Sequence, residues 1–285
     1  KLEIACATSD IGTGTYTILA QIGADALGLR MDDVTVMLGD SSLPPAPVQG
    51  GSWTAASAGS AVMAACETLR GKLLAAAARM PDSPVAKARL DDIVCAGGRM
   101  ALKADLSKSM SLAEIVMASN EPSLDAEETV KPSLLKHLRY SSFAHSAVFA
   151  EVRIDEELGV IRVTRMVSAV AAGRILNPKT ARSQIIGGVV WGVGMALHEE
   201  AMTDHHLGRT MNRSLAEYHL PVNADIQDID VIFVDEMDTK VSPIGVKGLG
   251  EIGIVGTAAA IANAVHHATG KRIRSLPITI DKVFD

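Results

Sequence analysis

The sequence predicts an α+β fold in which mixed sheets pack against helices. Strand patterns and helical patterns follow one another without the regular strand–helix alternation of a doubly wound sheet. The chain has 285 residues, of which 48% are hydrophobic, so it can bury a large core. Aromatic residues make up only 3% and 24 residues are glycine, which suits close approach of backbone segments to one another or to a ligand. We therefore expect one large folded unit with two lobes.

The chain begins with the pattern of a strand followed by a helix. Residues 2–8 predict the strand, and residues 12–15 form a tight glycine turn that leads into the helix. One face of this helix is apolar and carries Ile18, Leu19, Ile22 and Ala26. Gly28 suits its C-terminal cap, since glycine adopts the left-handed conformation at low cost.

A second strand and a long helix follow. Residues 33–38 alternate as a strand, whereas residues 43–47 contain too many prolines for either element. The small residues 50–60 then turn into a helix that ends at Pro81. Residues 82–142 carry weaker patterns, so we expect them to be peripheral or connecting.

The second half of the chain predicts a hairpin, two helices and one more strand. Residues 146–154 and 160–170 are rich in β-formers and flank a polar turn, which favours an antiparallel pair. Asn177-Pro178 is a strong helix start, and that helix runs toward Glu200. Residues 229–234 predict a strand, and a small-residue helix follows Glu251 to about Ala268.

Composition argues against several classes of function. The net charge is −6 and no basic run interleaves with aromatics, so nucleic acid is not an expected partner. The most apolar segments, 185–197 and 252–265, contain glycines and fall short of the roughly 20 residues that span a bilayer, so we expect no membrane span. The three cysteines lie far apart in the sequence, without the spacing of a zinc or iron–sulfur site.

Four glycine-rich or small-residue turns stand out, at residues 12–14, 50–59, 187–194 and 245–250. Backbone N–H groups at such turns and at helix N-termini bind anions, including phosphate. Any one turn is explained as well by backbone geometry or close packing. Together they favour a bound anionic cofactor.

Glu251 is the strongest candidate for chemistry. It follows Lys247-Gly248-Leu249-Gly250 and precedes an apolar helix, so its carboxylate is expected at a helix N-terminus. A purely structural role is the alternative, because acidic residues are common in the first turn of a helix.

Several motifs resemble, in the same order, those of the xanthine dehydrogenase/aldehyde oxidase family of molybdenum hydroxylases, over nearly the whole chain. Gly248-Leu249-Gly250-Glu251 resembles part of the closing signature of the family's large subunit. The other matching segments are residues 10–17, Thr54-Ala55-Ala56-Ser57, the helix from Asn177 through Gly194, the stretch 214–221 and residues 274–279.

The resemblance implies a fold, a cofactor and site residues. Residues 1–285 resemble the C-terminal molybdopterin-binding domain of that subunit, with lobes at approximately 1–142 and 143–285. Glu251 matches the catalytic base, and the dithiolene of the cofactor holds the molybdenum, so no side-chain metal ligand is expected. The cofactor-binding residues implied are Gly12, Thr13, Gly14, Thr54, Ala55, Ala56, Ser57, Trp191, Lys247, Gly248 and Gly250. Thr13 and Trp191 stand where the family often has glutamine, and in this they resemble bacterial aldehyde oxidoreductases that use molybdopterin cytosine dinucleotide.

The resemblance also implies an activity and partners. We expect water-dependent oxidation of an aldehyde or N-heterocycle, with iron–sulfur clusters and FAD on partner subunits and the N-terminal half of the same subunit as a further partner. The strand pattern at residue 1 has no initiator Met, so we expect a fragment of a longer polypeptide, inactive alone. Two alternatives remain, a non-catalytic cofactor-binding or assembly module and a carbon monoxide dehydrogenase relative. The bacterial cytoplasm and periplasm both stay open.

Overall fold

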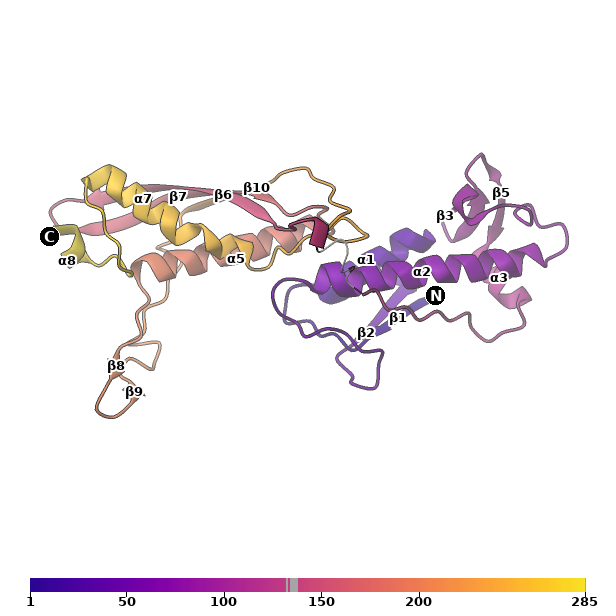
Figure 1. The fold of residues 1–285 in the computed structure, drawn as a ribbon, viewed down its shortest axis with the longest axis horizontal. Coiled ribbons are helices and arrows are strands. Elements are labelled where there is room, and N and C mark those ends of the chain that lie inside the picture. The colour runs from indigo at the N-terminus through magenta and orange to yellow at the C-terminus, as the bar shows by residue number, and fades with distance from the viewer. Residues whose placement is uncertain (132, 134–137, 285) are drawn as a thin grey trace. The chain divides into compact units, whose positions relative to one another are not determined.

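The computed structural model describes residues 1–131, 133 and 138–284, and the chain divides into two compact units. Unit 1 comprises Lys1–Ser142 and Asp238–Val246, and unit 2 comprises Phe143–Met237 and Lys247–Asp285. Both units combine helices with small sheets, which confirms the predicted α+β class (Figure 1).

Unit 1 begins with a strand–helix–strand crossover. β1 (Leu2–Cys6) pairs in parallel with β2 (Val34–Leu38), and α1 (Thr15–Leu27) with the short η1 (Met31–Asp33) connects them. Gly28 ends α1 in the left-handed conformation, at φ 59°, as predicted. The long α2 (Thr54–Ala78) packs against α1. The sequence pattern predicted no regular strand–helix alternation, yet each unit contains one such crossover.

The rest of unit 1 is built by the segment whose sequence pattern is weakest. After η2 (Leu90–Asp92), three antiparallel strands follow, β3 (Ile93–Ala96), β4 (Arg99–Leu102) and β5 (Asp105–Ser111), and then α3 (Leu112–Ala118). The expectation that residues 82–142 are peripheral was wrong. Val85, Ile93, Met100 and Ile115 are fully buried and pack in one cluster with residues of α1 and α2. These buried residues stand among polar ones in a turn, two short strands and a short helix, so no helical or strand period reveals them.

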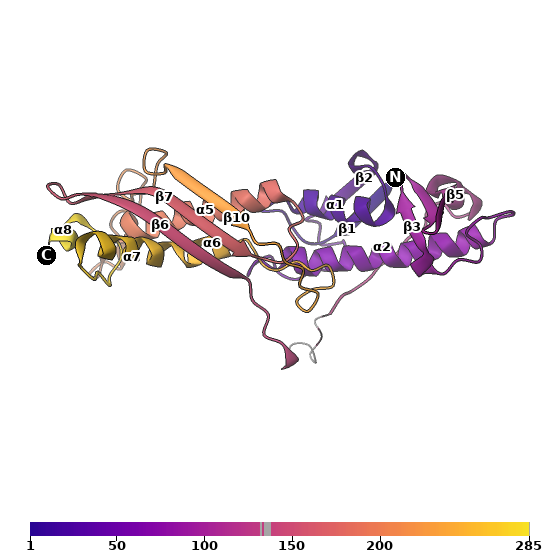
Figure 2. The same cartoon turned by 90° about the horizontal axis from the view of Figure 1, so that it is seen from above.

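Unit 2 is a three-stranded sheet with helices on one face (Figures 1 and 2). β6 (His145–Asp155) and β7 (Val160–Ala171) form the predicted antiparallel hairpin, and β10 (Asp228–Phe233) lies parallel to β7. The crossover helix α5 (Pro178–Leu197) and α7 (Thr257–Thr269) cover the buried face, where Met166, Ile185 and Ile261 are at the centre of the core.

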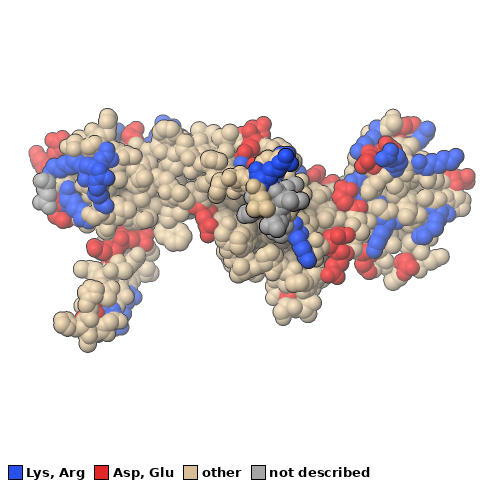
Figure 3. All heavy atoms as spheres, in the orientation of Figure 1, with Lys and Arg blue, Asp and Glu red and all other residues tan. Residues whose placement is uncertain are grey.

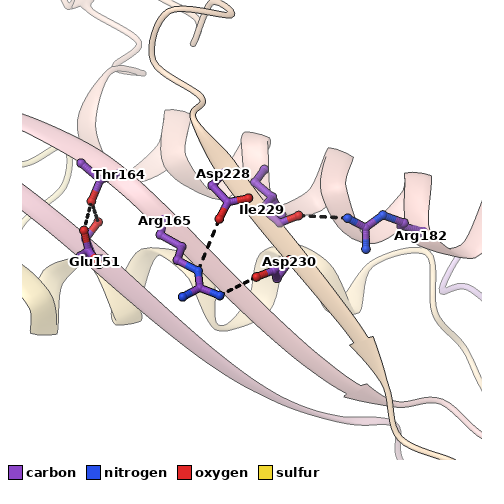
Figure 4. Close-up of polar contacts among 7 residues, drawn as sticks. All are labelled: Glu151, Thr164, Arg165, Arg182, Asp228, Ile229 and Asp230. Carbon is purple, nitrogen blue, oxygen red and sulfur yellow. Dashed lines mark hydrogen bonds and ion pairs between the residues drawn. The ribbon is translucent and has the colours of Figure 1, made fainter.

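The other face and the edge of this sheet are held by polar contacts (Figure 4). Arg165 of β7 pairs with Asp230 and Asp228 of β10, at 2.7 and 3.4 Å. From α5, the Arg182 guanidinium donates to the carbonyl oxygens of Ile229 and Val231 at the edge of β10. This contact satisfies acceptors that an edge strand otherwise exposes.

Helix ends in unit 2 follow local rules with one exception. Asn177 caps α5 as predicted, because its Oδ1 accepts from the N–H groups of Lys179 and Thr180. The single helix expected from Glu251 to Ala268 was wrong. It is broken at Gly256 into α6 (Ile252–Val255) and α7, and at this break Gly256 approaches β6 so closely that an added Cβ would lie 2.9 Å from Val148 Cγ2.

The remaining elements of unit 2 are small. β8 (Thr203–Asp204) and β9 (Arg209–Thr210) form a hairpin that projects from the body of the unit, as Figure 1 shows. α8 (Ile280–Phe284) follows α7 near the end of the described residues.

Candidate functional site

Two predicted cofactor segments of unit 1 begin helices that follow neighbouring parallel strands. The loop after β1 leads to Gly12–Gly14 and α1, and the loop after β2 leads to Thr54–Ser57 and α2. The loops are tied together, since Gly39 N donates to Thr8 O and Ala7 N donates to Pro44 O, both at 2.8 Å. Ligand sites of parallel sheets lie outside the carboxyl ends of the strands, which is where these two helix starts are.

At the first of these turns, a carboxylate side chain already accepts hydrogen bonds from the backbone N–H groups. Gly12 and Gly14 have φ of 103° and 88°, which only glycine adopts readily. The Asp10 carboxylate accepts from the N–H groups of Gly12, Gly14 and Tyr16, at 2.8, 3.2 and 3.3 Å. Partial burial acts to raise the pKa of Asp10, but these donors together bring it below its usual value. Asp10 therefore stands where a bound anion was expected.

The second helix start is open. The N-cap residue of α2, Trp53, makes no side-chain capping hydrogen bond, and among the described residues no side chain caps the N–H groups of Thr54, Ala55 and Ala56. The nearby Ser52 hydroxyl oxygen is buried and has no hydrogen-bond partner among the described residues. Because a helix N-terminus carries partial positive charge, this end of α2 suits an anionic group better than the start of α1 does.

In unit 2, Glu251 lies at the start of α6, as predicted, but it does not cap that helix. Its side chain is exposed and makes no capping hydrogen bond. No capping hydrogen bond supports the structural alternative, and the carboxylate is left available for other contacts.

Glycine contacts fix the helix that follows Glu251. A Cβ on Gly188 of α5 would lie 2.9 Å from the Cα and carbonyl carbon of Gly253, and one on Gly253 would lie 2.8 Å from the Ile185 carbonyl oxygen. The buried Thr257 hydroxyl donates to the Gly253 carbonyl oxygen at 2.9 Å, across the break between α6 and α7. The prediction of a turn at 187–194 was wrong, because these residues lie within α5, where the glycines allow close helix packing.

The Lys247 side chain is buried within the fold and does not extend outward as a ligand-binding side chain would. Its side chain is only 6% exposed, and its Nζ lies 2.6 Å from Glu236 Oε1. Glu236 Oε2 accepts from the N–H of Gly173, and Lys247 N donates to Ala172 O, both at 3.0 Å. Glu236 could not be predicted from the sequence, since no local pattern connects it to Lys247.

Trp191 lies on the exposed side of α5. The residue is 64% exposed, and Met195, one helical turn later, is also exposed. Trp191 is therefore not a core residue, and its contact with the cofactor stays a prediction.

The titratable and apolar groups of the described residues add three observations. No group of three His, Cys, Asp or Glu side chains is placed there to hold a metal ion. Burial raises the pKa of the Cys66 thiol to about 11 and raises that of Cys95 as well, so both are protonated thiols at neutral pH. Among the helices that the structure describes, none combines the length and apolar character needed to cross a membrane.

Comparison with known proteins gives a consistent family. The chain is 44% identical over 278 residues to the aldehyde oxidoreductase molybdenum-binding subunit PaoC of Escherichia coli K12, covering 97% of this chain and 36% of the relative. It is 30% identical to the 6-hydroxypseudooxynicotine dehydrogenase complex subunit gamma of Paenarthrobacter nicotinovorans, covering 100% and 36%. The chain thus spans about a third of the length of the curated relatives it matches.

Solved structures agree in fold. Quinoline 2-oxidoreductase from Pseudomonas putida 86 superposes with a TM-score of 0.82 at 26% identity, over 97% of this chain and 35% of that chain. The reconstituted CO dehydrogenase from Oligotropha carboxidovorans has a TM-score of 0.82 at 23% identity, over 97% and 34%, and this likeness concerns the fold alone. The model of the molybdopterin cofactor-binding domain family matches residues 1–227. The chain therefore belongs to the molybdopterin cofactor-binding domain family.

Proposed function

We propose that this chain is the C-terminal molybdopterin-binding domain of a molybdenum hydroxylase large subunit, and that Glu251 is the general base of that enzyme. The observation that carries the proposal is the exposed Glu251 carboxylate at the start of α6, in a chain whose family binds molybdopterin. In this proposal the two lobes of the domain correspond to the two compact units, with the boundary near residue 142, except that Asp238–Val246 belongs to the first unit and not to the second.

In unit 1 the first turn of α2 fits the anionic part of the cofactor. Thr54, Ala55 and Ala56 offer backbone N–H groups without a side-chain cap, and Ser52 adds a buried hydroxyl without a partner. Ser57 donates its hydroxyl to the Trp53 carbonyl oxygen, so it shapes the turn. The turn from Gly12 through Thr13 to Gly14 offers side-chain and carbonyl contacts instead, because Asp10 holds its N–H groups.

In unit 2 the proposed contacts come from Gly248, Gly250 and the exposed Trp191. Gly250 is exposed and neither glycine has a side chain, so a planar ligand can approach the backbone there. The indole of Trp191 offers a flat apolar surface and one N–H donor. We assign the cytosine dinucleotide form of the cofactor on the basis of Thr13 and Trp191, which stand where the family often has glutamine.

When bound, molybdopterin supplies the molybdenum that accepts the two electrons of the oxidation. The contribution of this chain is proton transfer by Glu251. Its carboxylate takes a proton from a water-derived oxygen as that oxygen attacks the electrophilic carbon of the substrate. An exposed carboxylate on an anchored segment is suited to this task, because it can contact a ligand without breaking an existing hydrogen bond.

The substrate class and partners follow from the relatives. One relative is named an aldehyde oxidoreductase and another, at 32% identity, a nicotine 6-hydroxylase, so we propose an aldehyde or N-heterocycle as substrate. Both names include a subunit designation, so we propose partner subunits that carry iron–sulfur clusters and FAD.

The projecting hairpin region supports a further partner within the same polypeptide. Its surface is largely uncharged in Figure 3, and exposed apolar side chains follow one another along it: Met202, Leu207, Met211, Leu215, Leu220 and Val222. Tyr218 holds the region to the end of α5, because its hydroxyl donates to Glu199 Oε2 at 3.0 Å, a bond that raises the pKa of Tyr218. We propose that the N-terminal half of the subunit covers this surface.

The test is chemical analysis of the complete subunit that carries this chain. We expect about one molybdenum per subunit, release of one cytidine monophosphate on acid hydrolysis, and dye-linked oxidation of aromatic aldehydes or N-heterocycles. A subunit that folds with its partners but contains neither molybdenum nor pterin would contradict the proposal. Release of no nucleotide from a molybdenum-loaded subunit would overturn the cytosine dinucleotide assignment alone.

A further inference from the structure

The segment that carries Glu251 is attached to unit 2 through an ion pair between the buried Lys247 and the partly exposed Glu236. Lys247 Nζ lies 2.6 Å from Glu236 Oε1, and the lysine side chain is 6% exposed. The second oxygen of Glu236 accepts from Gly173 N, just after β7, and Lys247 N donates to the Ala172 carbonyl oxygen. One carboxylate thus connects the end of β7, the segment after β10 and the segment that precedes Glu251.

Only three residues separate Lys247 from Glu251, and two of them are glycines. Glycine leaves the backbone a wide range of conformations, so this short segment has little stiffness of its own. Leu249 packs against the core of unit 2. On the far side of Glu251, the contact of Gly253 with Gly188 fixes the backbone again. The Glu251 backbone is therefore held from both sides, and Lys247 and Glu236 form the first of the two attachments.

A buried ion pair is a costly way to gain stability. Removing two charges from water offsets much of their attraction, and apolar residues of similar size are often as stabilising. The pair does fix geometry, because its hydrogen bonds have defined lengths and directions. The Lys247 ammonium is also directed to Glu236 within the fold. It is therefore not placed to contact a ligand directly.

We propose that Lys247 and Glu236 are positioning residues for Glu251, holding its carboxylate at the place where it takes the proton. This inference rests on the proposed function. It assigns Lys247 an anchoring role in place of the cofactor contact expected from the sequence, and it adds Glu236 to the residues on which turnover depends.

The experiment compares three variants of the complete, cofactor-loaded subunit. Glu236→Gln removes one charge and keeps an acceptor for Gly173 N, and the double variant Glu236→Gln/Lys247→Met removes both charges, so that no buried charge is left alone. Asp230→Asn is the matched control. It removes one charge from the Arg165–Asp230 pair on the sheet of unit 2, whose two side chains are 53% and 44% exposed.

We expect the double variant to lose 10- to 100-fold in kcat, with KM within about threefold and molybdenum content unchanged. Amide hydrogen exchange at residues 248–251, measured without cofactor or substrate, should become at least about 10-fold faster. Asp230→Asn should leave both quantities within twofold of the parent. If Glu236→Gln alone fails to fold, the double variant carries the test.

The outcomes separate this inference from the proposed function. A double variant with parental kcat and parental exchange, in an enzyme that Glu251→Gln inactivates, would overturn the positioning role and leave the proposed function intact. A lower melting temperature with unchanged kcat would likewise overturn it, since the pair would then serve stability alone. If Glu251→Gln retains full activity, the proposed function itself fails.

Discussion

Replacing Gly188 with alanine tests whether glycine packing fixes the segment after Glu251. The added Cβ would lie 2.9 Å from the Gly253 Cα and carbonyl carbon and from the Ile254 nitrogen. These are backbone atoms, which cannot rotate away as a side-chain end can. Gly187, its neighbour in the same helix, has open space where its Cβ would be, so Gly187→Ala is the matched control.

The comparison separates two opposing effects. Alanine in place of glycine favours a helix by about 0.8–1 kcal/mol, and this gain is the same at both positions. Carbon atoms in contact are about 3.5–4.0 Å apart, so at Gly188 the two helices must move apart. Overpacking of this kind costs about 1–3 kcal/mol. We therefore expect Gly188→Ala to be less stable than Gly187→Ala by about 1–3 kcal/mol.

The assay is urea and thermal unfolding of the full chain, followed by circular dichroism. Gly187→Ala should be slightly more stable than the parent, and Gly188→Ala should melt roughly 3–10 °C below Gly187→Ala. In the complete enzyme, Gly188→Ala should also lower kcat, because the start of α6 moves with the helix. Equal melting temperatures for the two variants would refute the packing argument.

Three further changes have simple expected outcomes. Asn177→Ala removes the acceptor at the start of α5 and should cost about 1 kcal/mol, seen as a lower urea midpoint; no change would contradict the capping role. Gly28→Ala should cost more than about 2 kcal/mol of stability in thermal melts, since its Cβ would lie 2.4 Å from the Cys95 carbonyl group. Gly97 is also left-handed but has open space where its Cβ would be, so the control Gly97→Ala should cost about 1 kcal/mol. Burial raises the pKa of Cys66 from 9.0 to about 11, so its contribution to stability is complete below pH 9 and falls as the pH rises toward 11. Urea midpoints across this pH range should fall less in Cys66→Ala than in the parent. Parallel curves of urea midpoint against pH for the two proteins would contradict this contribution of Cys66.

Features set by neighbouring residues could be predicted from the sequence. The hairpin of β6 and β7 follows from two β-rich runs around a polar turn, and the cap at Asn177 follows from the Asn-Pro pair. The C-cap at Gly28 follows from the end of an apolar helical face. In each case a short stretch of sequence contains both the residue and its partner.

Features that join segments distant in the sequence could not be predicted from it. Glu236 and Lys247 are eleven residues apart with a loop between them, and their pairing depends on where β7 and β10 end. Gly188 and Gly192 of α5 do lie in close contacts, but only the packing of α6 and α7 shows that these two glycines face helices and not a ligand. Asp10 is an intermediate case, because an acid two residues before Gly12 is a turn-forming pattern that local reasoning could have recognised.

The most direct test of the central claim is the turnover of Glu251→Gln in the complete subunit, with molybdenum and nucleotide content measured on the same sample. Gln keeps the size of Glu and one acceptor oxygen but cannot take a proton. We expect kcat to fall about 10²- to 10⁴-fold or more, as loss of a general base does, with cofactor content and melting temperature close to the parent. A fully loaded Glu251→Gln enzyme that oxidised aldehydes or N-heterocycles within a few-fold of the parent rate would contradict the role of Glu251 as the base.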